Sequence, residues 1–188
     1  MNKSTPPTQP PPKGGRPVES LVLVHTGDGK GKSTAAFGMM VRAVGHGWKP
    51  AVIQFIKSAA WQTGEEKAAR ILGVEWWTLG DGFTWDSSDL ERSEQLAAAA
   101  WGAAAEIIAS GENELVILDE ITYPINWGWI DVSDVVSAIM ERPARVSIVI
   151  TGRDAPDELV AIADTVTEMR NIRHAFDSGF AAKKGIDY

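Results

Sequence analysis

The chain has 188 residues, of which 44% are hydrophobic, and this suits one globular domain that buries its own core. It contains no cysteine, which excludes disulfides, thiolate metal sites and cysteine nucleophiles, and its net charge of −7 argues against a nucleic-acid partner recruited by bulk electrostatics. No apolar stretch reaches the roughly 18 residues of a membrane span and no secretory signal is visible, so we expect a cytoplasmic protein with no membrane partner.

The first segment is rich in proline. The stretch MNKSTPPTQPPPKGGRPVES holds six of the ten prolines and almost no large apolar side chain. Such a segment cannot bury enough surface to offset the entropy lost on ordering. We predict that residues 1–19 form a mobile tail and residues 20–188 a single domain. The alternative for the tail is a lid that orders over a ligand or a neighbouring subunit.

Short β-branched runs then alternate with helical patterns. The runs are LVLVH, AVIQFI, VEWWTL, ELVILDE and RVSIVIT. Helices are expected over residues 33–45, 88–110 (capped by Ser87 or Ser88) and 131–142, and near residue 156, before a short extended segment. This alternation predicts an α/β fold, with a mostly parallel central sheet and helices on both faces.

The segment HTGDGKGKST, His25 to Thr34, lies between the first strand and the first helix. A glycine-rich turn there presents backbone N–H groups and a helix N-terminus to phosphate oxygens. Gly27 stands only four residues before Gly31, one residue short of the usual P-loop spacing, so the match is to Gly31-Lys32-Ser33. We interpret this segment as a phosphate-binding loop; the alternative is a glycine-rich turn without a ligand.

The loop and one later strand together predict a nucleotide site. Lys32 would place a charge on the phosphates, Ser33 would offer a hydroxyl to Mg²⁺, and Lys30 would add a further cation. The strand ELVILDE ends in Asp119 and Glu120, where a carboxylate binds the metal directly or through water. We therefore expect a nucleoside triphosphate with Mg²⁺, or with Mn²⁺ as the alternative ion.

Several of the eight tryptophans fall where the pattern predicts loops. These are Trp61, Trp85, Trp127 and Trp129. The stretches LGDGFTWDSSD and TYPINWGWIDVSD follow strand ends, at the edge where an α/β protein binds its ligands. We interpret the aromatic residues as the rim of a site for a second, large, flat and largely apolar substrate; the alternative is simple packing.

A set of spaced motifs covers roughly residues 25–188: HTGDGKGKST, RAVGHG, QFIK, GEEKAA, GDGFTW, LDEITY, ITGRDAPDELVAIADTVTEMR, HAF and the terminal KKGIDY. In this order they resemble the motifs of the corrinoid adenosyltransferases (cob(I)alamin adenosyltransferases) of the bacterial cobalamin pathway. That family also carries the short Gly-x-x-x-Gly-Lys loop. The resemblance implies a RecA-like P-loop fold, with residues 20–188 as a single P-loop adenosyltransferase domain.

The resemblance also implies a reaction, in which the 5′-deoxyadenosyl group of ATP is transferred to Co(I) of a corrinoid and triphosphate is released. Co(I) is itself a strong nucleophile, so the protein must only align it with C5′ and stabilise charge on the triphosphate. Lys30, Lys32, the loop amides, and Mg²⁺ at Ser33 and Glu120 would do so. Asp119 would orient the metal's water or the neighbouring backbone.

Two aromatic residues match a family pair that covers the lower face of the corrin ring and expels the axial ligand. They are Phe83 and Trp85, and four-coordinate Co(II) is easier to reduce. The alternative is that the FTW stretch packs its own loop. Arg42 and His174 match positions near the ligands, with a structural role as the alternative for each. Asp28 departs from the asparagine usual in the family.

The expected ligand contacts are in the loop and at two outlying positions: Gly27, Asp28, Gly29, Lys30, Gly31, Lys32, Ser33, Thr34, Arg42 and His174. The resemblance implies cobalamin, cobinamide or cobyrinic acid diamide as the corrinoid, a reduced flavoprotein as the electron donor, and a homodimer. One alternative is a generic RecA-like P-loop ATPase or a small-molecule kinase that cleaves the γ-phosphate. Another is a binding module that holds ATP and a corrinoid without turnover.

Overall fold

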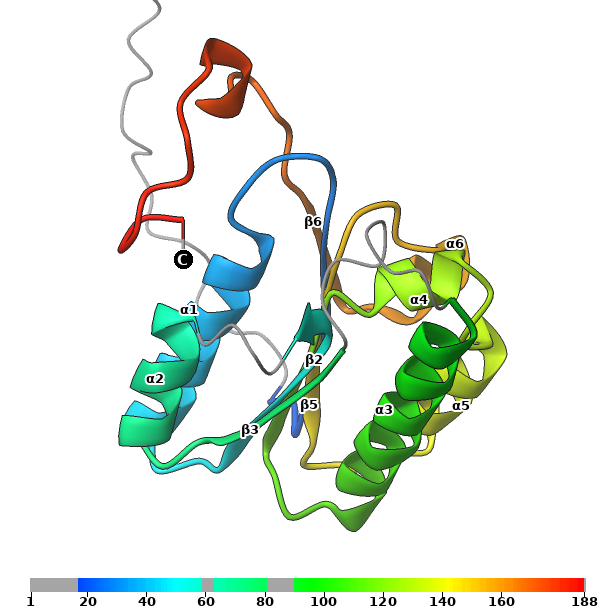
Figure 1. Ribbon diagram of the computed structural model, residues 1–188. Helices are drawn as coiled ribbons and strands as arrows, with labels where there is room; N and C mark the ends of the chain where they lie inside the picture. Colours follow the sequence, from blue (N-terminus) through cyan, green and yellow to red (C-terminus); the bar gives the residue numbers. More distant parts are fainter. Residues whose placement is uncertain (1–16, 59–62, 81–89, 188) are drawn as a thin grey trace, which may run out of the picture.

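The computed structural model describes residues 17–58, 63–80 and 90–187. These residues form a six-stranded sheet in the order β3-β2-β4-β5-β1-β6 between two layers of helices (Figure 1). The strands are β1 (Val22–Thr26), β2 (Pro50–Ser58), β3 (Glu75–Gly80), β4 (Leu115–Asp119), β5 (Ser147–Thr151) and β6 (Thr165–Glu168). All neighbouring strands pair in parallel, which confirms the expected α/β fold.

The strand sequences follow from their places in the sheet. β4 and β5 are buried at every residue, because helices cover both faces, and their sequences LVILD and SIVIT are apolar except at the ends. β6 is exposed at every residue and lies at the edge, next to β1. It is the short extended segment that the sequence predicts after the last helix.

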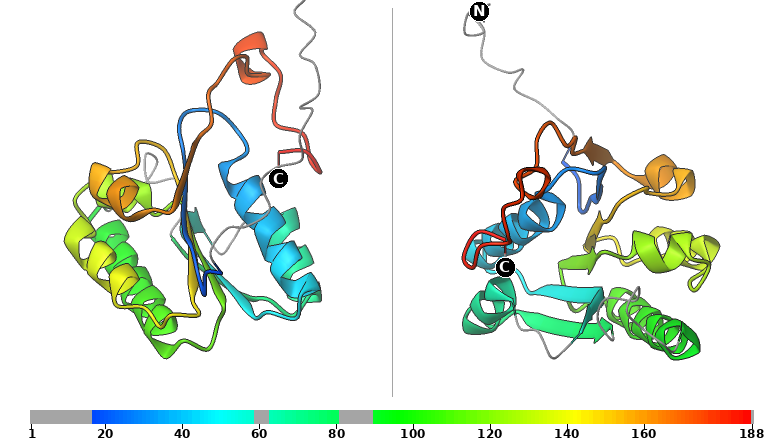
Figure 2. Two further views of the ribbon diagram at one scale, coloured as in Figure 1. Left: turned by 180° about the vertical axis from the view of Figure 1, so that it is seen from behind. Right: turned by 45° about the horizontal axis from the view of Figure 1, so that its top comes forward.

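Helices α1 and α2 cover one face of the sheet, and α3, α5 and α6 cover the other (Figures 1 and 2). The helices are α1 (Lys32–Gly45), α2 (Gly64–Ile71), α3 (Leu90–Ser110), α4 (Thr122–Asn126), α5 (Val132–Met140) and α6 (Asp157–Ile162). In the part of the chain that is described, no helix combines the length and the apolar character needed to cross a membrane. The cap expected at Ser87 or Ser88 lies outside the described residues.

Two short helices were not placed by the sequence pattern. α2 begins after Thr63, whose hydroxyl accepts a hydrogen bond from the Glu66 N–H at 3.2 Å. α4 occupies part of the stretch TYPINWGW that we expected to be a loop. Its proline, Pro124, lies in the first turn, where the missing N–H is tolerated, and the Trp127 N–H closes a turn on the Tyr123 carbonyl at 2.9 Å.

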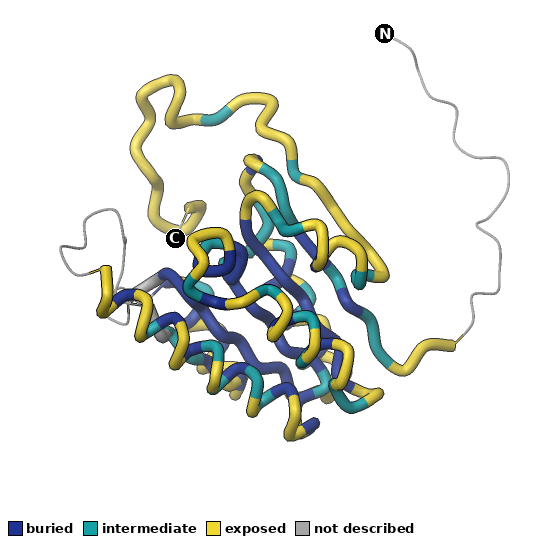
Figure 3. The backbone as a smooth tube through the Cα atoms, turned by 90° about the vertical axis from the view of Figure 1, so that its right-hand side faces the viewer, coloured by how far each residue is buried: buried dark blue, intermediate teal, exposed yellow. Residues whose placement is uncertain are grey.

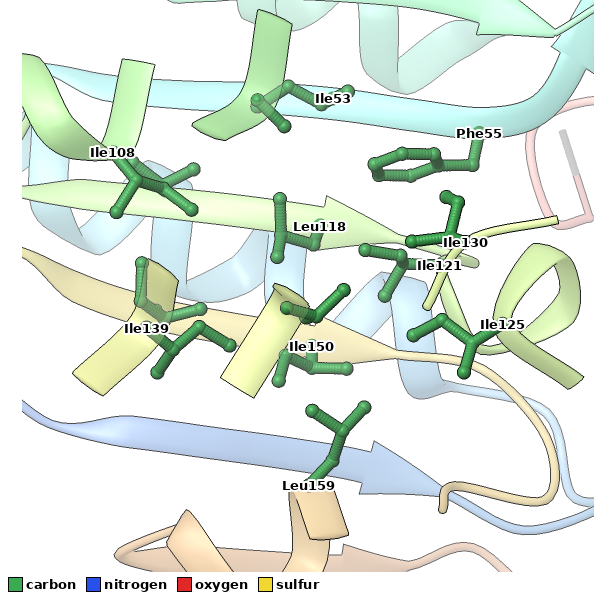
Figure 4. Close-up of a cluster of buried hydrophobic side chains, with 14 of the residues drawn as sticks. Ile53, Phe55, Ile108, Leu118, Ile121, Ile125, Ile130, Ile139, Ile150 and Leu159 are labelled. Carbon is green, nitrogen blue, oxygen red and sulfur yellow. The ribbon is translucent and has the colours of Figure 1, made fainter. Parts of the chain in front are cut away.

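The core has two parts, one on each face of the sheet. Figure 4 shows the part beneath α3, α5 and α6, where Leu118 and Ile150 of the central strands meet Ile108, Ile139 and Leu159 of the helices. Each such side chain contributes about 1.5–3 kcal/mol when it is fully buried. The outer faces of the helices are exposed while the central strands are buried (Figure 3). This core holds the carboxyl ends of the strands rigidly at one edge.

After β6 the chain returns toward the start of α1. A one-turn 3₁₀ helix, η2 (Phe176–Ser178), interrupts this C-terminal segment, residues 169–187, which is almost entirely exposed. The segment comes back beside α1 (Figures 1 and 2). It thus brings the last residues of the chain to the loop that follows β1.

Candidate functional site

The loop between β1 and α1, residues 27–31, lies at the carboxyl edge of the sheet. Gly27 and Gly31 have φ angles of 91° and 113°, in the left-handed region that strains other residues. α1 carries no acidic residue in its first turn, and Gly31 supplies no side-chain cap. The N–H groups and the positive end of the helix dipole therefore suit an anion, as the sequence predicts.

The glycines of the loop also make room for the protein's own chain. The Gly29 N–H donates to the Met169 carbonyl at 2.6 Å, and the Met169 N–H donates to the Thr26 carbonyl at 2.8 Å. A Cβ atom would lie 2.5 Å from the Met169 oxygen if built on Gly27, and 2.7 Å if built on Gly29. The contact between Gly29 and Met169, called the brace below, was not predicted from the sequence. It joins segments far apart in the chain, and no local pattern indicates it.

The side chain of Lys32 folds into the loop. Its ammonium group donates to the carbonyl oxygens of Gly27 and Gly29, both at 2.7 Å. These bonds hold the charge where the loop N–H groups and the helix N-terminus converge. The predicted position of Lys32 among the phosphate-binding groups fits this geometry.

The charges around Lys32 come from three strand ends. Burial away from water lowers the pKa of Lys32, and the Arg153 guanidinium lowers it further, while Glu120, Asp28 and Asp154 act in the opposite direction. An incoming polyanion would offset both the burial of the Lys32 charge and its repulsion by Arg153, because it would neutralise the two cations together. The electrostatics of the site thus suit a phosphate chain.

Glu120 follows β4 directly and adopts an unusual backbone conformation. Its φ angle is 62°, although it is not a glycine, and its N–H donates to the Thr151 hydroxyl at 3.0 Å. Asp119, one residue earlier, is fully buried; its two carboxylate oxygens accept from Thr151 Oγ1 and Gln54 Nε2, both at 2.8 Å. Of the two roles predicted for Asp119, this geometry favours orientation of the neighbouring backbone.

The donor set at this edge can be tested against Mg²⁺. Within residues 17–58, 63–80 and 90–187, no three His, Asp or Glu side chains gather as a metal cage. Mg²⁺ commonly keeps several waters and takes one or two carboxylates together with substrate phosphates. Ser33, half-buried in the first turn of α1, and Glu120, half-buried at the end of the nearby β4, fit an ion that arrives with its nucleotide.

Arg153 belongs to the site, although the sequence pattern predicted only a loop for its segment, GRDAP. It follows β5, and its guanidinium Nη1 lies 3.7 Å from Asp28 Oδ1. The signal that could have pointed to it is an arginine two residues after a buried strand. The contact also provides a partner for Asp28, whose negative charge beside a phosphate loop was unexplained. At this exposure such a pair contributes only about 0–1 kcal/mol.

Lys30 and His174 both act on Asp187, near the end of the C-terminal segment. The Lys30 ammonium pairs with Asp187 Oδ1, and Asp187 Oδ2 accepts from the Lys183 N–H at 2.8 Å. The Lys183 N–H and then Lys30 lower the pKa of Asp187, and the charge of His174 acts in the same direction. His174 Nδ1 accepts from the Phe176 N–H at 3.1 Å. Lys30 is thus bound to the C-terminal segment.

Other predicted residues lie apart from this cluster. Arg42 is exposed in the last turn of α1, ten residues after Lys32, which is about 15 Å along the helix. Thr34 is exposed in the first turn. Phe83, Trp85 and Trp61 lie outside the described residues, so the corrin-facing role of the first two stays a prediction.

Two of the tryptophans predicted at the rim lie beside the Glu120 turn. The ring centroids of Trp127 and Trp129 are 4.7 Å apart, and those of Tyr123 and Trp127 are 5.7 Å apart. Trp129 and Tyr123 pack partly against the core, whereas Trp127 is 36% exposed. Burial raises the pKa of Tyr123. The cluster therefore combines packing with an apolar surface near the charged site.

Comparisons with known proteins agree with this site. The family model described as ATP:corrinoid adenosyltransferase BtuR/CobO/CobP matches residues 18–188. A corrinoid adenosyltransferase of Pseudomonas aeruginosa is 44% identical over 175 residues, 92% of this chain and 86% of the relative. One of Escherichia coli K12 is 42% identical over 168 residues, 89% of this chain and 85% of the relative.

The corrinoid adenosyltransferase CobA of Salmonella typhimurium is 40% identical over 168 residues, with 89% of this chain and 85% of the relative covered. The family match contains the loop, both strand-end acidic residues, Arg153 and the C-terminal segment. It also confirms the resemblance inferred from the motifs. The chain belongs to the ATP:corrinoid adenosyltransferase BtuR/CobO/CobP family.

Proposed function

We propose that this protein transfers the 5′-deoxyadenosyl group of ATP to the Co(I) centre of a corrinoid and releases inorganic triphosphate. The observation that carries the proposal is a P-loop of this family with two cations, Lys32 and Arg153, close enough to affect each other electrostatically. In this reaction the electron pair of Co(I) forms the cobalt–carbon bond at C5′. The C5′–O bond breaks, and its electron pair leaves on the triphosphate.

The residues of the site would act on the leaving group. Lys32, the loop N–H groups and the N-terminus of α1 would bind the phosphate oxygens and stabilise the charge that develops on them. Arg153 would add a second cation. Mg²⁺ would be held by Ser33 and Glu120 with the phosphates, and it would supply further charge neutralisation. Alignment of C5′ with cobalt is then the main remaining task of the protein.

A γ-phosphate-cleaving ATPase or kinase would use the same loop, and the products separate the two activities. We would mix the protein anaerobically with Mg-ATP and chemically reduced cob(I)alamin, follow the corrinoid spectrum, and identify the phosphate product. We expect a light-sensitive adenosylated corrinoid and equimolar triphosphate. An unchanged corrinoid with accumulating ADP and phosphate would overturn the proposal, and tight binding of both ligands without reaction would indicate a binding module.

Further parts of the proposal concern the corrinoid and the setting of the reaction. Phe83 and Trp85 would cover the lower corrin face, with the Trp127 and Trp129 cluster at the rim. Cobalamin, cobinamide and cobyrinic acid diamide are the candidate substrates, and a reduced flavoprotein is the candidate electron donor. A homodimer in the cytoplasm completes the proposal. Arg42 and His174 would contact the ligands from outside the loop.

A further inference from the structure

A row of buried polar side chains crosses three neighbouring strands at the carboxyl edge of the sheet. Gln54 of β2 is 2% exposed, and Asp119 of β4 and Thr151 of β5 are fully buried. Gln54 and Asp119 are partners in the register of β2 and β4, and Thr151 follows the partner of Leu118 on β5. Parallel pairing therefore places the three side chains side by side.

The hydrogen bonds of this row run in one direction. The Gln54 amide donates to Asp119 Oδ2, and the Thr151 hydroxyl donates to Asp119 Oδ1, each at 2.8 Å. A hydroxyl has one proton, so once Thr151 donates to the carboxylate, its oxygen is left to accept. The Glu120 N–H supplies that bond at 3.0 Å. The buried carboxylate thus fixes which way the Thr151 hydroxyl faces Glu120.

Glu120 requires such support, because a φ of 62° is sparsely populated by residues other than glycine. The next residues are also tightly held. A Cβ atom built on Gly152 would lie 1.8 Å from Thr122 Oγ1, so the turns after β4 and β5 touch. Contacts from β5 and from the turn that follows it therefore hold the backbone at Glu120 and just after it.

We propose that Gln54, Asp119 and Thr151 form a positioning network that holds the Glu120 backbone, with Asp119 as its buried anchor. Through Glu120 the network sets the affinity of the site for the divalent cation of the nucleotide. This inference rests on the proposed role of Glu120 in holding that cation. Residues that orient a metal ligand typically change cation affinity about 10–100-fold when they are replaced.

The test replaces Thr151 by valine, which keeps the shape but removes the hydroxyl, and by serine, which keeps the hydroxyl. Mn²⁺ binding to the full chain in the presence of ATP, without corrinoid, is measured by electron paramagnetic resonance. We expect Thr151→Val to weaken Mn²⁺ binding about 10-fold or more, and Thr151→Ser to stay within about 2-fold of wild type. Equal binding by wild type and Thr151→Val, or an equal loss in both variants, would overturn the network.

A second pair of variants separates positioning from general destabilisation. If Thr151 acts through Glu120, adding Thr151→Val to Glu120→Gln should cost no further Mn²⁺ affinity, whereas independent effects would add. Should Thr151→Val fail to fold, Gln54→Met, which cannot donate to Asp119, is expected to weaken Mn²⁺ binding in the same direction. Unchanged binding by a folded Gln54→Met would then overturn the proposal.

The same proteins are assayed for adenosyl transfer with prereduced cob(I)alamin. We expect the valine variant to need more Mg²⁺ for half-maximal rate while the maximal rate changes little. Wild-type protein that binds Mn-ATP with the expected variant effects but forms no cobalt–carbon bond would refute the proposed function and leave the network standing. Normal transfer by the wild type, with unaltered cation binding in Thr151→Val, would refute the network and leave the proposed function standing.

Discussion

Burial disfavours the positive charge of Lys32, whereas the proposed function requires that charge. The loop removes its ammonium from water and Arg153 repels it, so its pKa lies below the ordinary lysine value of about 10.4. A lowered pKa means that Lys32 loses its proton at a lower pH than a lysine in water. Bound triphosphate would favour the charged form and raise the pKa again. Binding of ATP should therefore take up protons in the alkaline range.

We predict this proton uptake in the alkaline range, above the pH at which ATP itself titrates, because the lowered pKa brings the titration of Lys32 below that of an ordinary lysine. Isothermal titration in two buffers with different ionisation enthalpies measures it directly. Lys32→Met keeps most of the length of the side chain without the charge and should show no uptake, together with a loss of adenosyl transfer of about 10²–10³-fold. Equal uptake by the variant and the wild type would assign the proton to another group.

Phe83 and Trp85 carry a prediction that concerns reduction rather than transfer. An apolar lower face disfavours an axial ligand, and four-coordinate Co(II) is easier to reduce. Replacing both residues with alanine should therefore impair adenosylation that starts from cob(II)alamin more than adenosylation that starts from prereduced cob(I)alamin. Initial rates from the two starting states give the comparison. Equal losses would leave the pair with a packing role.

At the scale of elements, the chain that leaves β6 supports the loop that follows β1. The Gly29 N–H bonds to the Met169 carbonyl, and a side chain on Gly29 would collide with the Met169 and Arg170 backbone. The end of the C-terminal segment adds a second contact, between Asp187 and Lys30. The phosphate-binding loop is thus supported by the segment that completes the chain.

Gly29→Ala tests this brace. The added Cβ must displace backbone, so we expect a loss of about 1–3 kcal/mol in the free energy of unfolding, measured with denaturant, and weaker ATP binding. Gly38→Ala is the matched control, because a Cβ atom on Gly38, on the exposed side of α1, would meet nothing within 4 Å and alanine favours a helix. It should be neutral or stabilise by up to about 1 kcal/mol. A neutral Gly29→Ala would show that the loop does not depend on the segment.

At the scale of the whole molecule, the site is built from the ends of β1, β4 and β5, and the C-terminal segment leaves large apolar side chains in water. Ile172, Phe176, Phe180 and Ile186 are 66–84% exposed. A single chain gives them little to pack against, whereas a second copy would bury them and gain about 25 cal/mol for each Å² of apolar surface. The homodimer that the family resemblance implies would bury this surface between its two copies.

We predict a mass in solution of about twice the 20.3 kDa of the chain, measured by light scattering. Replacing Phe176 and Phe180 together by serine should shift the protein toward the monomer. Ile71→Ser provides the control, since Ile71 is 86% exposed but belongs to α2 and not to the C-terminal segment. A monomeric wild-type protein would exclude the homodimer, and dissociation by Ile71→Ser instead would move the interface to α2.

The sequence by itself determined the parallel α/β architecture, the loop at residues 27–31 and the acidic end of β4. Each of these depends on local information: an apolar run of strand length, glycines next to a lysine, or a carboxylate after a strand. The same local signals, taken in order, identified the family. The short helix α4 was not predicted, because its sequence carries residues typical of turns. Packing against the core favours the helix instead.

Only the tertiary structure decided which distant groups meet. The contact of Met169 with Gly29, the pairing of Asp28 with Arg153, and the row that fixes Glu120 all join residues that belong to different strands or to the loops that follow them. Strand order and register set these contacts, and neither is written in the residues of any one segment. A motif specifies what a side chain can do, whereas the partner that orients or neutralises it comes from whichever strand the sheet places beside it.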